Sequence, residues 1–233
     1  MDRLAIQVAF AMLPGLLWLS WARRQDRTGT ETAGRLLWVF TLGCFSAFAV
    51  LLIRWRWERL VESATLSLDL VFVDAFVVTA ALEEWCKGMA FGLGARRKRA
   101  NDDACAGLIY GVAAGLGFAS VENLFYLQAT GEPMVVILRS FTALLVHVGC
   151  SGLLGHALWR VRMGASRWRG LATFVEVVLL HGLYNLFLIS FPEARLIALL
   201  MALPLLLVIF SWHFRHACDG RESCIWVRPQ PKT

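Results

Sequence analysis

Charged residues are scarce in this chain: Asp, Glu, Lys and Arg together make up 17% of its 233 residues, whereas hydrophobic residues make up 58%. A soluble domain of this size carries about a quarter charged residues and a little under half apolar ones. The low charge therefore excludes an ordinary soluble domain. It predicts a polytopic membrane protein whose core is helix against helix and whose surface faces lipid.

Three further features of the sequence limit the class of protein that it can encode. The chain has six cysteines but no close pair of the kind that zinc-binding modules use, since Cys218 and Cys224 are separated by DGRES. We expect all six to be reduced and structural. The first apolar run lacks a basic leader and a clear cleavage site, which indicates a retained span. The net charge of +6 comes from short basic clusters between apolar runs, as in membrane loops, so no nucleic-acid partner is expected.

Seven apolar segments are long enough to span a bilayer, which takes about 20 residues. They are residues 4–22, 36–53, 68–94, 104–128, 134–159, 170–191 and 196–214. The predicted fold is all-α, a transmembrane helix bundle of about seven spans that forms one domain (residues 1–214) with a short cytoplasmic tail (residues 215–233). The middle four segments carry nearly every intramembrane polar group, so we expect them to form the bundle interior.

The orientation follows from the distribution of basic residues. Of the 23 Lys and Arg residues, sixteen lie in four alternate connecting or terminal segments, at 23–35, 96–99, 160–169 and 215–232. Six lie on the opposite side, and Lys87 lies inside a span. This asymmetry predicts that the N-terminus is outside and the C-terminus is in the cytoplasm.

Two carboxylates and two imidazoles are predicted to meet at one depth. Glu83, Glu84, His147 and His181 each lie twelve or thirteen residues along their helices from an inner basic cluster. A rise of 1.5 Å per residue places all four about 18–20 Å from the inner boundary. Charged groups at that depth usually face a bundle interior and are functional. Imidazole and carboxylate are the usual ligands of a catalytic zinc ion, so this convergence predicts a shared site.

Each of these residues also has a simpler interpretation. A lone membrane histidine is more often a packing or hydrogen-bonding residue than a ligand. Glu83 could form a structural ion pair with Lys87, four residues away, and a single carboxylate could serve a proton path. Four such groups at one depth favour the shared site over these separate explanations.

The fourth predicted span combines a glycine repeat with two polar residues. Gly107, Gly111 and Gly115 recur every four residues, which predicts a smooth face for close helix packing. A straight helix would place Glu122 about 28 Å from the inner boundary, above the other four groups. Either the helix bends, the boundary lies later in the chain, or Glu122 serves the outer mouth.

Four ordered motifs resemble those of the PrsW intramembrane metalloproteases, distant relatives of the CAAX prenyl proteases. EEWCK is similar to the EExxK element of that family, and the glycine-rich span ends in a match to FxxxEN. A third element carries Arg139, His147 and Gly152. HGLYN resembles the closing HGxYD element, with Asn185 where Asp is more usual. The first loop also departs from the family, since TGTETAG replaces an acidic-proline pattern.

The resemblance implies a protease that cuts a membrane-anchored protein, in some members an anti-sigma factor, within the bacterial cytoplasmic membrane. It implies a divalent metal, with zinc the expected ion, held by His147, His181 and Glu122. One glutamate of the pair would be the general base; we favour Glu84, with Glu83 held by Lys87, although the reverse order is open. The remaining implied roles are oxyanion stabilisation by Asn185 or Asn123 and structural support from Lys87 and Arg139.

Two other classes of protein would use similar residues. A proton-coupled transporter or channel needs buried carboxylates and histidines, but the sequence shows no two-fold repeat of broken spans, which is usual in secondary transporters. A non-catalytic membrane scaffold that binds single-span partners would not need the complete motif set. Metal content of the purified protein separates the protease from the scaffold.

Overall fold

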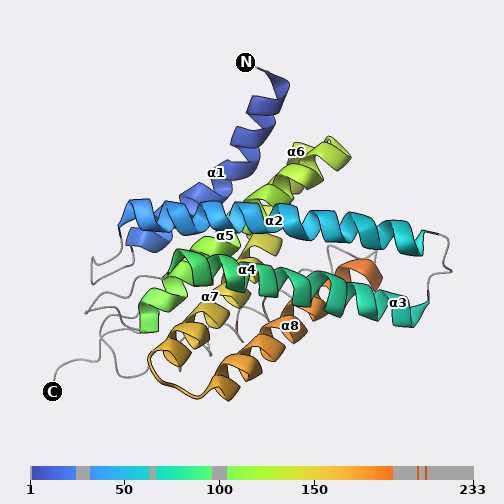
Figure 1. Cartoon of the computed structure of the whole chain (residues 1–233). Coiled ribbons are helices and arrows are strands. Elements are labelled where there is room, and N and C mark those ends of the chain that lie inside the picture. The colour runs from blue at the N-terminus through green and yellow to red at the C-terminus, as the bar shows by residue number, and fades with distance from the viewer. Residues whose placement is uncertain are drawn as a thin grey trace.

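The computed structural model describes residues 2–24, 32–62, 67–95 and 104–190, together with Pro204 and Val208. Within the four continuous ranges all regular structure is helical (Figure 1). The elements are α1 (Arg3–Arg24), α2 (Ala33–Val61), α3 (Leu68–Phe72), the π-helix η1 (Val73–Ala81), α4 (Leu82–Gly94), α5 (Ala104–Thr130), α6 (Pro133–Phe141), α7 (Ala143–Arg162) and α8 (Arg167–Ser190).

Among the described residues, five helices are long and apolar enough to cross a membrane: α1, α2, α5, α7 and α8. The third predicted span, 68–94, is continuously helical but is divided among α3, η1 and α4. The all-helical membrane architecture is therefore confirmed. Apart from Pro204 and Val208, the seventh predicted span lies outside the described residues, as do the tail and the basic segment 96–99. The predicted domain bounds stay a prediction.

The fifth predicted span is wrong as a single helix. Residues 134–159 are divided between α6 and α7 at Thr142, whose backbone angles (φ −123°, ψ −85°) are not helical. The Thr142 hydroxyl donates to the carbonyl of Leu138, and the Thr142 carbonyl accepts from the first turn of α7. One residue thus ends α6 and begins α7, and the break separates Arg139 from His147.

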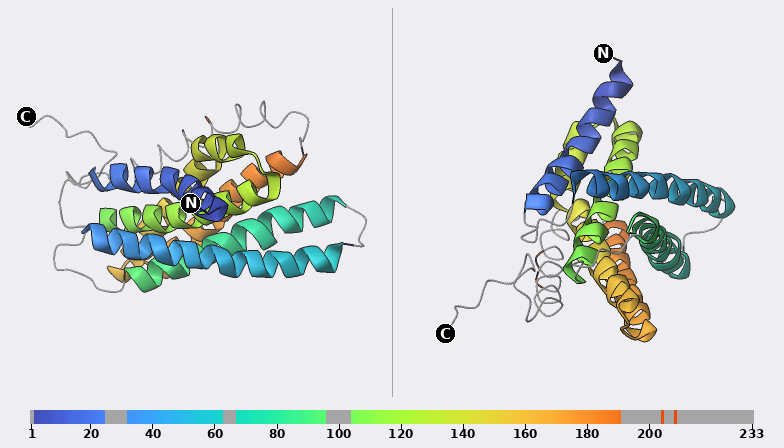
Figure 2. Two further views of the ribbon diagram at one scale, coloured as in Figure 1. Left: turned by 90° about the horizontal axis from the view of Figure 1, so that it is seen from above. Right: turned by 60° about the vertical axis from the view of Figure 1, so that its left-hand side comes forward.

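Helix α5 is the centre of the bundle and packs against α1, α2 and α7 (Figures 1 and 2). The predicted close packing at its glycines is confirmed. A Cβ on Gly111 would overlap the backbone carbonyl of Ser151, and one on Gly115 would lie 2.8 Å from the backbone carbonyl oxygen of His147. These glycines allow α7 to approach α5 closely directly behind His147.

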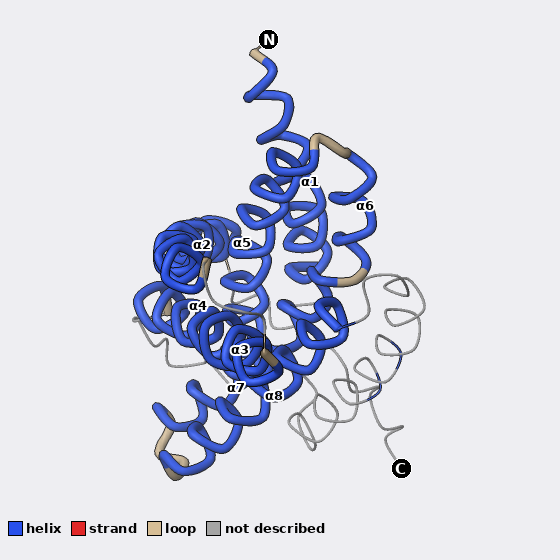
Figure 3. Tube along the Cα trace, turned by 90° about the vertical axis from the view of Figure 1, so that its right-hand side faces the viewer, coloured by secondary structure: helices blue, strands red, loops and turns tan. Residues whose placement is uncertain are grey.

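The π-helix η1 leads into α4 and packs against α8. Figure 3 looks nearly along α2 and α4, which lie side by side. A Cβ on Gly182 would overlap the ring of Phe76, so the absence of a side chain lets α8 approach η1 next to His181. π-Helical turns inside helices frequently occur at functional sites. This one ends two residues before the Glu83–Glu84 pair.

Candidate metal centre

The structure brings together the polar groups that the sequence places at one depth. Helix α4 contributes Glu83, Glu84 and Lys87, α7 contributes His147 and α8 contributes His181. Each of the five side chains is buried, with no more than 2% of any residue's surface exposed. Buried charges are costly unless they are paired, so their mutual contacts determine what the site can do.

Lys87 connects three of these groups. Its ammonium donates to Glu83 Oε2 at 3.2 Å and to Glu84 Oε1 at 2.8 Å. It also lies 2.7 Å from Nδ1 of His147. An ammonium can only donate, so Nδ1 of His147 presents its lone pair and this imidazole carries its proton on Nε2. Lys87 therefore fixes a tautomer of His147 as well as balancing carboxylate charge.

The second nitrogen of each imidazole contacts a separate carboxylate. Nε2 of His147 donates to Glu122 Oε2 at 2.9 Å, and Nδ1 of His181 donates to Glu84 Oε1 at 2.9 Å. The protons are assigned to these nitrogens because an ionised carboxylate can only accept. Histidines that bind metals almost always donate their other N–H to a carboxylate, a carbonyl or water. Both imidazoles have this arrangement. The other nitrogen of each ring lies on the side of Glu83, and in His147 that nitrogen accepts from Lys87.

Glu83, His147 and His181 fit a metal ion. Oε2 of Glu83 lies 3.8 Å from Nδ1 of His147 and 3.7 Å from Nε2 of His181, and the three ligand atoms lie within 4.8 Å of one another. Tetrahedral zinc with bonds of about 2.0–2.2 Å separates its ligands by about 3.3–3.6 Å. The donor set and spacing therefore suit a divalent metal, provided that the Lys87 ammonium moves away from His147.

Glu122 and Arg139 form a layer beside His147. Arg139 Nη2 donates to Glu122 Oε2 at 2.7 Å, and Arg139 Nε donates to the Oδ1 of Asn123 at 2.9 Å. Glu122 thus lies next to the cluster, although a straight helix had placed it higher. Within the described residues Glu83, and not Glu122, completes the group of three candidate ligands. The sequence identified the Glu83–Glu84 pair, but it contains no signal that shows which of the two would bind a metal and which would act as a general base.

A small polar cavity of about 90 Å³ adjoins the cluster. Its lining includes Glu122, His147, His181 and Asn185. The side-chain nitrogen of Asn185 is buried and has no hydrogen-bond partner among the described residues. This amide can donate to a polar group in the cavity, which is consistent with its predicted role. Its role and that of Asn123 stay predictions.

The fold and this cluster define a helical membrane protein with a buried group of side chains that could hold a metal ion. The chain belongs to the PrsW family of intramembrane metalloproteases, whose model matches residues 31–212. It is therefore a peptidase, and the predicted family is confirmed.

Several curated relatives are similar over nearly their whole length. The chain is 28% identical to Protease PrsW of Oceanobacillus iheyensis over 209 residues, which cover 89% of this chain and 94% of the relative. It is 26% identical to Protease PrsW of Bacillus subtilis over 223 residues, which cover 92% and 95%. Protease PrsW of Clostridioides difficile is 26% identical over 76% and 77%. No solved structure matches the chain.

Proposed function

We propose that this protein hydrolyses a peptide bond of a membrane-anchored protein at the buried cluster of Glu83, Glu84, His147 and His181. The observation that carries the proposal is the arrangement of the two histidines. Each imidazole donates to its own carboxylate, and the other nitrogen of each ring lies on the side of Glu83. This is the ligand geometry of a metal-dependent hydrolase, with zinc the expected ion.

In this mechanism Glu83, His147 and His181 hold the metal, while Glu84 and Glu122 orient the two imidazoles. A divalent metal at this position would polarise the scissile carbonyl and lower the pKa of water toward neutrality. Glu122 thus moves from the predicted ligand set to a supporting role, held by Arg139. The hydrogen bond between Glu122 and His147 supports this proposed role.

Glu84 is the proposed general base. Its Oε1 is engaged by Lys87 and His181, whereas within the described residues its Oε2 has a single contact, with the hydroxyl of Ser151 at 3.4 Å. The second oxygen is therefore available to accept a proton from water and to return it to the leaving amine. Asn185 is the proposed donor to the developing oxyanion, because its amide nitrogen is buried beside the cluster and has no partner among the residues that the structure describes.

The proposed setting is the bacterial cytoplasmic membrane, with the N-terminus outside and the C-terminus in the cytoplasm. The asymmetry of basic residues supports this orientation. A single-span protein such as an anti-sigma factor is the proposed substrate class.

The test uses the purified full chain in liposomes with a panel of single-span bacterial anti-sigma factors. The wild type should cut at least one member, and a chelator that reaches the membrane interior should stop the reaction. Glu84→Gln should retain metal but lose about 10²–10⁴-fold in rate. If no panel member is cut faster by the wild type than by Glu84→Gln, the proposal fails and proton-coupled transport becomes the better account.

A further inference from the structure

An apolar groove adjoins the cluster on the side of α4, α7 and α8. It has a volume of about 470 Å³ and is lined mainly by apolar side chains, together with Glu84 and Arg167. Its apolar wall includes Trp85, Gly88, Met89, Leu154, Leu158 and Phe174. Glu84 is fully buried and also contributes to the lining of the groove, so the groove reaches the residue that belongs to the cluster.

The groove opens toward lipid. Trp85, Met89 and Leu171 on its walls are 59%, 49% and 49% exposed, and all three are large and apolar. Such side chains on a membrane protein face the hydrocarbon region. A segment that moves laterally from the bilayer can therefore enter the groove without crossing a polar surface.

The polar cavity adjoins the cluster on a different side from the apolar groove. Its lining includes Glu122, His147 and His181, whereas the groove is lined by Glu84. Water and an apolar segment can thus approach the same cluster along separate paths. A hydrolase that acts on a membrane-embedded chain needs a path for water and a path for its apolar substrate.

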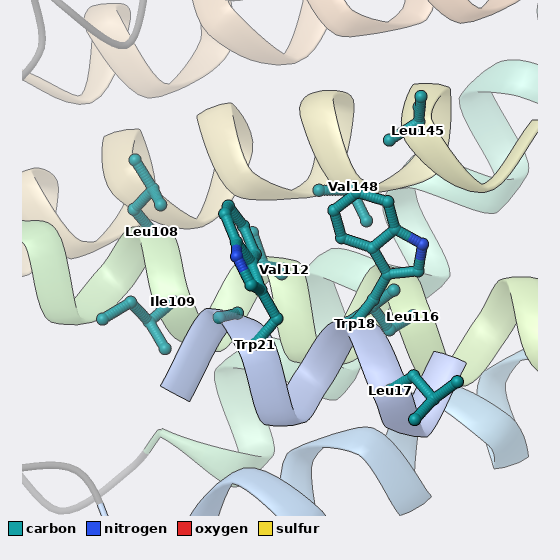
Figure 4. Close-up of a pocket in the computed structure, with 10 residues that line it drawn as sticks. Leu17, Trp18, Trp21, Leu108, Ile109, Val112, Leu116, Leu145 and Val148 are labelled. Atoms are coloured by element: carbon teal, nitrogen blue, oxygen red, sulfur yellow. The ribbon is translucent and has the colours of Figure 1, made fainter. Parts of the chain in front are cut away.

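A second apolar groove lacks this connection. It lies between α1, α5 and α7, has a volume of about 650 Å³ and is lined by residues that include Trp18 and Trp21 (Figure 4). Among the described residues, its lining includes no charged side chain and no member of the cluster. The larger groove therefore offers an apolar surface without access to the chemistry.

We propose that the α4/α7/α8 groove binds one apolar segment of the membrane-anchored substrate, and that Arg167 selects an acidic residue at one end of that segment. This inference rests on the proposed function. Arg167 is exposed at the start of α8, beside the turn that joins α7 to α8. No ion pair joins Arg167 to another residue in the described part of the chain. An exposed cation at the end of an apolar groove complements an apolar segment that ends in a carboxylate.

Gly88 provides a way to close the groove. A Cβ at this position would lie 3.5 Å from Leu154 and 3.8 Å from Leu158, which are ordinary contact distances. A leucine at position 88 therefore has room at its first carbon and extends into the groove. Gly92 lies one turn along the same helix and does not line the groove, and the nearest neighbour of a Cβ there is the guanidinium of Arg162 at 3.9 Å. Gly92→Leu is the matched control.

The test is photo-cross-linking with the full chain in liposomes. The probe is a synthetic single-span polypeptide of about 20 Leu and Ala residues, with an Asp at the end nearest Arg167. A photoreactive residue at Met89 should capture the probe. One at Leu93, which is on the same helix, is 50% exposed and does not line the groove, should not. Gly88→Leu should reduce capture from Met89 at least fivefold, and Gly92→Leu should not.

The role of the Arg167 charge is tested by reversing the charge at position 167 and then the charge at the end of the probe. Arg167→Glu should weaken capture of the Asp probe about two- to fivefold, the range of an exposed ion pair, and a Lys probe should restore it. If photoreactive residues at Met89 and Leu93 capture the probe equally, or if Gly88→Leu leaves capture unchanged, the probe does not bind in the α4/α7/α8 groove and the proposal is refuted. If neither Arg167→Glu nor the replacement of Asp by Lys in the probe changes the amount captured, the proposed role of Arg167 is wrong. Cleavage is scored separately with the anti-sigma panel: normal cleavage without capture rejects the groove alone, and capture without cleavage rejects the proposed function alone.

Discussion

Replacing Glu122 with glutamine distinguishes a metal ligand from a residue that orients one. Glu122 Oε2 accepts from His147 at 2.9 Å and from Arg139 at 2.7 Å. Glutamine keeps the size of the side chain but removes its charge, so His147 loses an anionic partner while Glu83 and His181 are untouched. Such changes weaken metal binding about 10–100-fold. This corresponds to about 1.4–2.8 kcal/mol. We expect Glu122→Gln to bind one metal per chain at correspondingly lower affinity.

The assay combines metal content of the purified protein with competition against a chelator of known affinity. Glu83→Gln should lose stoichiometric metal, because it removes a ligand. Glu58→Gln is the control: Glu58 is exposed and pairs with Arg54 at 3.7 Å on the surface of α2, so metal affinity should not change. If Glu122→Gln loses the metal while Glu83→Gln keeps it, our ligand assignment is refuted and Glu122 is the ligand.

Four further outcomes are expected. Glu84→Gln should remain folded and keep its metal while cleavage falls about 10²–10⁴-fold in the liposome assay. Lys87→Ala should lower the free energy of unfolding in detergent by about 3–5 kcal/mol, because two buried carboxylates lose their partner. Gly111→Ala should cost about 1–3 kcal/mol in the same measurement, since its Cβ would overlap a backbone carbonyl of α7. A reporter fused after Thr233 should be cytoplasmic and one at Gly131 external; finding both on one side contradicts the topology.

The sequence predicted the helical class and much of the cluster because both depend on regular helix geometry. Apolar length identified the spans, and a constant rise per residue placed Glu83, Glu84, His147 and His181 near one depth. The four-residue glycine spacing predicted the contact between α5 and α7 for the same reason. These properties require only that each segment be a helix.

Where the prediction failed, tertiary geometry was responsible. Nothing in the local sequence marks the break at Thr142, since neither proline nor glycine adjoins it and the flanking residues are apolar. The depth of Glu122 was estimated for a straight, upright helix, and this estimate ignores the tilt at which helices cross. The proposed choice of Glu83 over Glu84 as the metal ligand depends on the rotation of α4 about its own axis, and the sequence left both orders open. Only packing against the neighbouring helices fixes that rotation.

The charge balance of the cluster supports a cation site. Three carboxylates, those of Glu83, Glu84 and Glu122, face the two cationic groups of Lys87 and Arg139. With neutral imidazoles these five groups sum to minus one, and Arg54 and Asp74, which line the adjoining cavity, add one charge of each sign. A buried charge that remains uncompensated is unfavourable by several kcal/mol. A divalent ion would change this residual charge from minus one to plus one. In the proposed reaction Glu84 takes a proton from water as the oxyanion forms, so the total charge of the site would not change, while the groups that surround the oxyanion would carry a charge of plus two instead of plus one. The site would therefore stabilise the oxyanion more than the uncharged peptide, and this difference is what accelerates a reaction.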